Sequence, residues 1–144
     1  MMKSGRILVG FDGSAYAKKA VNYVINNFDR GSSVCLVYVE QSLASMYLST
    51  ESPLIDDSMI KRMKNKAENE LGKEAAYIQK KGFSVKYVYL EGYPSEEILK
   101  EARKEKADII IIGSRGMSRW KGSLLGSVSQ ALAVNSGIPL LIIR

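Results

Sequence analysis

Residues 108–116 read Asp-Ile-Ile-Ile-Ile-Gly-Ser-Arg-Gly, and this stretch decides the fold class. Its four consecutive isoleucines form a short, continuous apolar run, which is typical of a β-strand that is buried on both faces. Such strands belong to parallel sheets whose two faces are covered by helices. Two glycines follow the run, and glycine lets the main chain bend sharply and approach a ligand closely. The stretch therefore predicts a central strand of a parallel α/β sheet that ends in a glycine-rich loop.

The rest of the chain alternates short apolar runs with amphipathic helical segments. Further strands are expected at residues 7–11, 34–39, 85–90 and 138–143. Helical periodicity occupies the segments between the strands, at residues 17–28, 57–81, 93–102 and 128–135. The run at 85–90 is the least apolar of the strands, so it is expected near an edge of the sheet. The order predicts one doubly wound, parallel α/β domain over residues 1–144, with helices on both faces of the sheet.

The connections are predicted from turn residues and from the absence of periodicity. Gly31 is expected to close the first helix, and Gly82 is expected to close the second. Residues 41–55 contain serine, threonine and one proline without a clear period, so they are expected to form a long irregular connection.

The composition excludes several classes of protein. With 46% hydrophobic and 25% charged residues among 144, the chain has the composition of an ordinary globular domain. It has no histidine, which excludes Ser-His-Asp and Cys-His catalysis and every histidine-ligated metal site. Cys35 is the only cysteine, so no disulfide can form within the chain, which fits a reducing compartment. The first apolar run is too short for a signal peptide or a membrane span, so we expect a cytoplasmic protein without a membrane segment.

The net charge of +6 raises the question of nucleic-acid binding. The basic residues alternate with glutamates, as in residues 61–74 (KRMKNKAENELGKE), which is typical of a solvated helix face. No aromatic residues are interleaved with arginines as a platform for stacked bases. The pattern therefore argues against a nucleic-acid partner.

Candidate ligand-binding residues follow the predicted strands, because ligands of open parallel sheets bind beyond the carboxyl ends of the strands. Asp12 follows the first strand and accepts hydrogen bonds, which suits a sugar hydroxyl. Val39 ends the second strand. Gly113 and Gly116 follow the isoleucine run, where main-chain N–H groups can converge on a phosphate.

The start of the last predicted helix offers a second set of hydrogen-bond donors. Gly126 and Ser127 stand there, where unpaired N–H groups and the positive end of the helix dipole favour an anion. The hydroxyls of Ser127 and Ser129 can add hydrogen bonds, and Arg115 can screen phosphate charge. Neither a Gly-x4-Gly-Lys-Ser/Thr motif nor a Gly-x-Gly-x2-Gly motif occurs at the expected place. The segment therefore predicts a phosphate-binding loop of another kind.

The glycines of this loop have a specific spacing. The pattern Gly113-x2-Gly116-x9-Gly126-Ser127 resembles the Gly-x2-Gly-x9-Gly-Ser/Thr signature of the ATP-binding branch of the universal stress protein family. Asp12 is similar to the aspartate that follows the first strand of that family. The resemblance covers essentially the whole chain.

The resemblance implies a fold and a ligand site. It implies a Rossmann-like sheet of five parallel strands in the order 3-2-1-4-5, as in adenine nucleotide alpha hydrolases. It also implies ATP as the ligand, with Mg²⁺ bridging its phosphates. Adenine is then expected at the main chain of Val39, and the ribose at Asp12 and the main chain of Gly10. The residues expected around the phosphates are Gly113, Arg115, Gly116, Gly126, Ser127, Val128 and Ser129.

The resemblance implies a partner as well, because similar proteins often dimerise through the last strand. Here that strand is the run from Pro139 to Ile143, which is almost entirely apolar. A strand at a sheet edge leaves hydrogen-bonding groups open, and pairing with the same strand of a second copy satisfies them. A two-fold homodimer is therefore expected.

The residues leave several alternatives open. The glycine-rich segment could be a flexible surface loop, Asp12 a turn residue, and Val39 a core residue.

For the whole protein, we expect a stress or signalling module that holds ATP as a regulatory ligand. The alternatives are a slow ATPase or nucleotide-transferring enzyme of related fold, and an interaction module without a nucleotide. Hydrolysis needs a base near the γ-phosphate, and Asp12 and Glu40 are the only carboxylates that follow central strands, so at most weak hydrolysis is expected.

Overall fold

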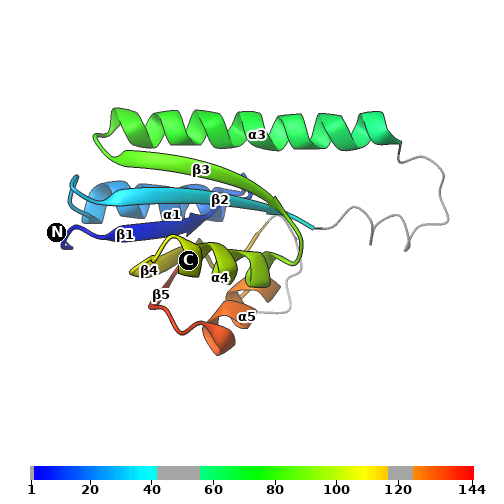
Figure 1. The fold of residues 1–144 in the computed structure, drawn as a ribbon. Helices are drawn as coiled ribbons and strands as arrows, with labels where there is room; N and C mark the ends of the chain where they lie inside the picture. Colours follow the sequence, from blue (N-terminus) through cyan, green and yellow to red (C-terminus); the bar gives the residue numbers. More distant parts are fainter. Residues whose placement is uncertain (1, 42–55, 117–124) are drawn as a thin grey trace.

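The computed structural model describes residues 2–41, 56–116 and 125–144. These residues form five strands and four helices that alternate along the chain (Figure 1): β1 (Arg6–Gly10), α1 (Ala15–Asn27), β2 (Ser33–Glu40), α3 (Asp57–Lys80), β3 (Ser84–Glu91), α4 (Pro94–Lys104), β4 (Ile109–Gly113), α5 (Ser127–Asn135) and β5 (Leu140–Ile143). Most of the expected irregular connection, residues 42–55, lies outside the described residues, as do residues 117–124 of the glycine-rich segment.

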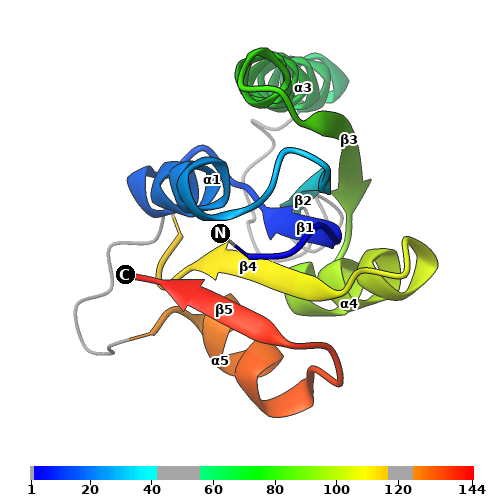
Figure 2. The same cartoon turned by 90° about the vertical axis from the view of Figure 1, so that its left-hand side faces the viewer.

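The strands form one parallel sheet in the order β3-β2-β1-β4-β5, which confirms the expected order 3-2-1-4-5. The least apolar strand, β3, lies at one edge as predicted, and β5 lies at the other. Viewed along the strands, α1 and α3 cover one face of the sheet, and α4 and α5 cover the other (Figure 2). The fold is therefore the doubly wound, Rossmann-like α/β architecture that the sequence predicted.

Each face of the sheet has its own hydrophobic core. Because successive side chains of a strand point to opposite faces, Ile111 packs in the core beneath α1 and α3, whereas Ile110 and Ile112 pack beneath α4 and α5. Ile110 and Ile111 are completely buried. The isoleucine run thus contributes to both cores, as expected of a central strand.

Two predicted boundaries were wrong. Helix α1 ends at Asn27 rather than near Gly31, because the backbone of Phe28 is extended and forms a parallel bridge with Met2. Strand β5 begins at Leu140 rather than at residue 138, since Pro139 has no N–H group with which to join the ladder. The end of α3 was predicted correctly, because Gly82 has the positive φ of 98° that is typical of a helix C-terminus.

Among the helices of the described residues, none combines the length and the apolar character that a membrane span requires.

Candidate nucleotide site

A cavity of about 560 Å³ opens at the carboxyl ends of β1, β2 and β4, beside the first turns of α4 and α5. This is the edge of the sheet where open α/β folds bind their ligands. All the residues that the sequence analysis assigned to the site line this one cavity: Gly10, Asp12, Val39, Gly113, Arg115, Gly116, Gly126, Ser127, Val128 and Ser129. Segments more than 100 residues apart in the chain are thus brought to one place.

The turn after β1 holds Asp12 in a fixed orientation. Its Oδ1 accepts a hydrogen bond of 2.9 Å from the N–H of Ser14, and Ser14 Oγ in turn accepts one from the N–H of Ala17 and caps α1. The other carboxylate oxygen, Oδ2, lies 2.6 Å from the position that a Cβ on Gly116 would occupy. Asp12 therefore acts as a turn residue through one oxygen while its other oxygen faces the glycine-rich loop.

Gly113 is needed because the main chain of α1 lies close to it. A Cβ on Gly113 would stand 2.9 Å from the carbonyl oxygen of Tyr16, at the start of α1. The N–H of Gly126 donates a hydrogen bond of 2.6 Å to the carbonyl oxygen of Ser114. This bond joins the two ends of the glycine-rich segment, so that all three glycines of the motif lie in one small region of the cavity wall.

The N-terminus of α5 faces the same cavity. Gly126 is the N-cap residue, and no side chain caps the first turn of this helix. Ser127 is exposed, whereas Ser129 is 2% exposed. The hydroxyl of Ser129 donates to two carbonyl oxygens, that of Gly113 at 3.0 Å and that of Ser114 at 3.2 Å. Ser129 therefore ties α5 to the end of β4, a role that the sequence analysis did not foresee.

An apolar slot forms the part of the cavity that lies between β2 and α4. Its walls are side chains that the sequence analysis read as core or did not assign: Val37, Pro94, Ile98 and Ile112. A Cβ on Gly10 would lie 3.0 Å from Ile112 Cγ2, so this glycine keeps the floor of the slot open. The slot thus combines apolar walls with the exposed main chain at the end of β2.

The end of β2 brings two ionisable side chains, Tyr38 and Glu40, to the cavity. Burial raises the pKa of Glu40 at the end of β2, and the Glu91 carboxylate raises it further. Burial, followed by the charge of Glu40, raises the pKa of Tyr38 to about 12, so this phenol stays protonated. Arg115 and the N-terminus of α5 lie on the side of β4. Within the described residues, no three His, Cys, Asp or Glu side chains are grouped as a metal site.

Comparison with known proteins places the chain in a family. The sequence model of the universal stress protein family matches residues 3–144, and the chain belongs to that family. Universal stress protein YxiE of Bacillus subtilis is 27% identical to it, over 96% of this chain and 98% of the relative. Universal stress protein MJ0577 of Methanocaldococcus jannaschii is 39% identical over a shorter region, 62% of this chain and 53% of the relative.

Solved structures agree with the fold. The structure of MJ0577 superposes with a TM-score of 0.84 at 29% identity, over 96% of this chain and 94% of the other. A universal stress protein from Archaeoglobus fulgidus in complex with dAMP superposes with a TM-score of 0.68 at 19% identity, with both chains fully covered. The structure of a universal stress protein in complex with cAMP superposes with a TM-score of 0.65 at 19% identity, over 98% of this chain and 97% of the other.

Proposed function

We propose that this protein binds ATP in the cavity at the carboxyl ends of β1, β2 and β4 and uses it as a regulatory ligand in a stress or signalling role. The observation that carries the proposal is that every residue of the Gly-x2-Gly-x9-Gly-Ser motif lines the same cavity as Asp12 and Val39. The volume of about 560 Å³ lies within the usual range for small-molecule sites.

The apolar slot is the natural place for adenine. Flat, apolar walls from Val37, Pro94 and Ile98 suit a planar ring, and the main chain at Val39 offers a donor and an acceptor to its edge. The side chain of Val39 packs in the core beneath α4 and α5, so its contribution to the edge of the ring comes from the backbone.

The ribose and the phosphates fit the remaining walls. Asp12 supplies acceptors for ribose hydroxyls next to the main chain of Gly10. The loop at Gly113 and Gly116 and the N-terminus of α5 supply N–H donors for the phosphates, with Arg115 as a nearby cation. Magnesium commonly binds through one or two carboxylates plus substrate phosphates, so Mg²⁺ would enter with the nucleotide rather than occupy a site built by protein alone.

We assign ATP the role of ligand rather than substrate. Among the described residues, the carboxylates that line the cavity are Asp12, which is proposed at the ribose, and Glu40, which lies at the end of β2. Asp12 is held by the N–H of Ser14 through one oxygen and is proposed to bind the ribose through the other, and Glu40 lies beside the proposed adenine, so neither is assigned as the base that hydrolysis needs. Solved relatives with cAMP and dAMP add support, because both ligands are adenine nucleotides.

Calorimetric titration with ATP, AMP, cAMP and GTP tests the proposal. We expect saturable binding of ATP and weaker binding of GTP. Gly116→Ala is expected to weaken ATP binding at least tenfold, because the new methyl group displaces the Asp12 carboxylate, whose Oδ2 lies 2.6 Å from its position. Since that contact is with the end of a side chain, the fold is expected to be retained.

Gly137→Ala is the matched control, because nothing lies within 4 Å of a Cβ at Gly137. It is expected to bind ATP like the unaltered protein. Absence of saturable ATP binding at millimolar concentration would contradict the proposal. Phosphate release that depends on Ser127 or Asp12 would favour the alternative of a slow ATPase.

We also propose that two copies pair through the last strand, residues 139–143. Strand β5 is an edge strand whose four apolar side chains are only partly buried, and Val134 on the adjacent α5 is 82% exposed. The carbonyl oxygens of Pro139 and Ile143 accept hydrogen bonds from the β4 side. By the alternation of a parallel ladder, Leu140 and Ile142 direct their N–H and C=O groups to the open edge.

Ile142→Pro tests the pairing, because it removes an edge N–H that the monomer does not use and proline is tolerated at such positions. Sedimentation is expected to give a dimer for the unaltered protein and a monomer for the variant, with unchanged circular dichroism. A stable monomer of the unaltered protein at micromolar concentration would contradict the dimer.

A further inference from the structure

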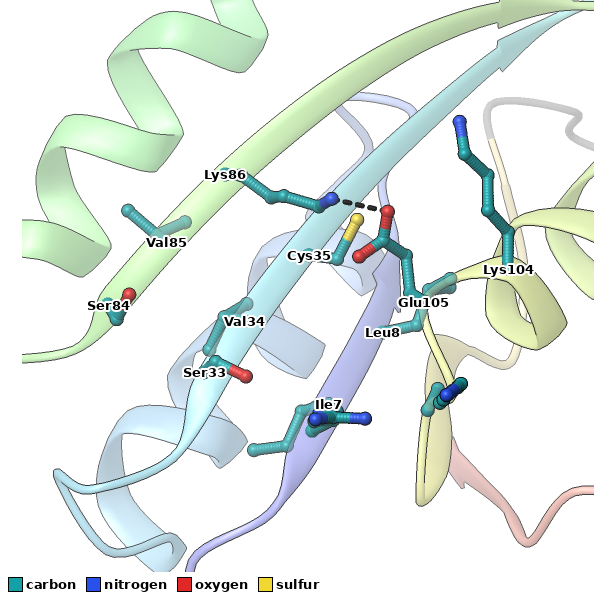
Figure 3. Close-up of a pocket in the computed structure, with 13 residues that line it drawn as sticks. Ile7, Leu8, Ser33, Val34, Cys35, Ser84, Val85, Lys86, Lys104 and Glu105 are labelled. Atoms are coloured by element: carbon teal, nitrogen blue, oxygen red, sulfur yellow. Dashed lines mark hydrogen bonds and ion pairs between the residues drawn. The ribbon is translucent and has the colours of Figure 1, made fainter.

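A second cavity, of about 430 Å³, lies at the opposite, amino end of the sheet (Figure 3). It exists because α4 is too short to cover its face. The 11 residues of α4 span about 16 Å, whereas the eight residues of β3 span about 26 Å. The sheet surface beyond the last turn of α4 is therefore open, and the residues 104–107 that follow form one wall of the cavity.

The sheet side of this cavity consists of two rows of side chains that run across β1, β2 and β3. In the inner row, Leu8 pairs with Cys35, and Cys35 pairs with Lys86. In the outer row, Arg6 pairs with Ser33, and Ser33 pairs with Ser84. Neighbouring strands lie about 4.8 Å apart, so the outer row places a guanidinium and two hydroxyls along roughly 10 Å. All three residues of the outer row are exposed and can donate hydrogen bonds.

The charge of the lining is strongly positive. Among the described residues that line it, the cations are Arg6, Lys86, Lys104 and Lys106, and the one carboxylate is Glu105. Lys86 and Glu105 form an ion pair beside the Cys35 thiol (Figure 3). Their hydrogen bond raises the pKa of Lys86 and lowers that of Glu105. Burial raises the pKa of Cys35 to about 12, so the thiol adds no negative charge. Within the described residues, no ion pair joins any of the other three cations to a carboxylate.

Lys106 has a backbone conformation that residues other than glycine rarely adopt. Lys106 has a φ of 52°, and it is the only residue other than glycine with a positive φ in the described parts of the chain. Glycine or asparagine is the usual residue at such a position after a helix. Lys104 lies in the last turn of α4, where a positive charge stabilises the helix C-terminus. That stabilisation does not explain the positive charges of Arg6 and Lys86, which come from two strands of the sheet.

We propose that this second cavity binds a small phosphorylated molecule through the guanidinium and hydroxyls of its outer row and the lysines of its rim. Guanidinium, hydroxyl and ammonium donors from three strands and from the residues 104–107 line one cavity, and they suit the oxygens of a phosphate or pyrophosphate. The apolar floor at Leu8 and Cys35 accommodates the uncharged part of the ligand. This site is independent of the proposed ATP cavity, which lies at the other end of the same strands.

Titration of the full chain with pyrophosphate, followed by two-dimensional amide NMR, tests this site. We expect saturable shifts at the amides of residues 33–35, 84–86 and 104–107. Lys106→Gly is the decisive variant, because glycine relieves the positive φ and removes one cation. It is expected to raise the melting temperature and yet to weaken pyrophosphate binding about three- to tenfold. A defect in folding cannot produce that combination.

Two controls separate this site from other causes. Lys66→Gln removes an exposed lysine of α3 that does not line the cavity, and it is expected to leave binding unchanged. Asp12→Asn alters the ATP cavity, and it too is expected to leave these shifts unchanged. Equal shifts with sodium chloride at matched ionic strength would overturn the proposal as charge screening. Shifts confined to residues 113–116 and 126–129 would overturn the proposal, because they would place pyrophosphate in the ATP cavity. Absence of ATP binding would contradict the proposed function but not this second site.

Discussion

Replacing Gly113 by alanine is expected to destabilise the protein by about 3 kcal/mol and to abolish nucleotide binding. A Cβ at this position would lie 2.8 Å from the carbonyl carbon of Tyr16 and 2.9 Å from its oxygen. These are main-chain atoms of α1, so no side-chain rotation relieves the contact and the helix itself must move. The same movement displaces the turn at Asp12 and the loop after β4, which are two walls of the proposed ATP site. Urea denaturation measures the first effect, and ATP titration measures the second.

Gly137→Ala is again the control, since it adds the same methyl group where nothing lies within 4 Å. Its free energy of unfolding is expected to change by less than about 1 kcal/mol. If Gly113→Ala were as stable as this control, the close packing of β4 against α1 would be wrong. If it were unstable but still bound ATP with normal affinity, the placement of the phosphates near Gly113 would be wrong.

Ile111→Ala is expected to lower the free energy of unfolding by about 2–5 kcal/mol. Ile111 is 0% exposed and lies in the middle of β4, where it packs in the core beneath α1 and α3. Its truncation leaves a cavity between the sheet and two helices, and a central strand cannot move to fill it. Urea denaturation with an unchanged m-value would show that the loss comes from stability alone.

Ile109→Ala is the matched comparison for this core. Ile109 is the same residue type on the same face of the same strand, but it is only partly buried and lies at the start of β4. Its truncation is expected to cost about 1–2 kcal/mol. Equal losses at the two positions would contradict the burial gradient along the isoleucine run.

The order of elements was predictable because each strand of this sheet is a short apolar run with helical periodicity on either side. The ends of elements were less predictable, as the first helix demonstrates. Phe28 continues the apolar periodicity of α1 and is buried, yet it lies outside the helix because its backbone pairs with Met2 instead. That contact joins residues far apart in the sequence, so no local pattern reveals it. Gly31 therefore appeared to be the closing residue.

The candidate site was predictable where it depends on glycine. The spacing of Gly113, Gly116 and Gly126 indicated a loop, and in the structure these residues line one cavity. The apolar slot was not predicted, because Pro94 and Ile98 have the same sequence signal as core residues of a helix. They become cavity walls only because α4 crosses the end of β2, which is a property of the topology. Their position near the start of a helix that follows a strand is the signal that could have identified them.

The arrangement of β1 between β2 and β4 has a consequence for synthesis of the chain. One side of β1 can pair as soon as β2 is made, but its other partner is completed only at residue 113. At roughly 5–20 residues per second, the intervening stretch of about 70 residues takes about 4–15 s to leave the ribosome. During this interval the nascent polypeptide has an apolar strand with one unpaired edge. That edge of β1 therefore has no partner strand of its own chain until β4 emerges.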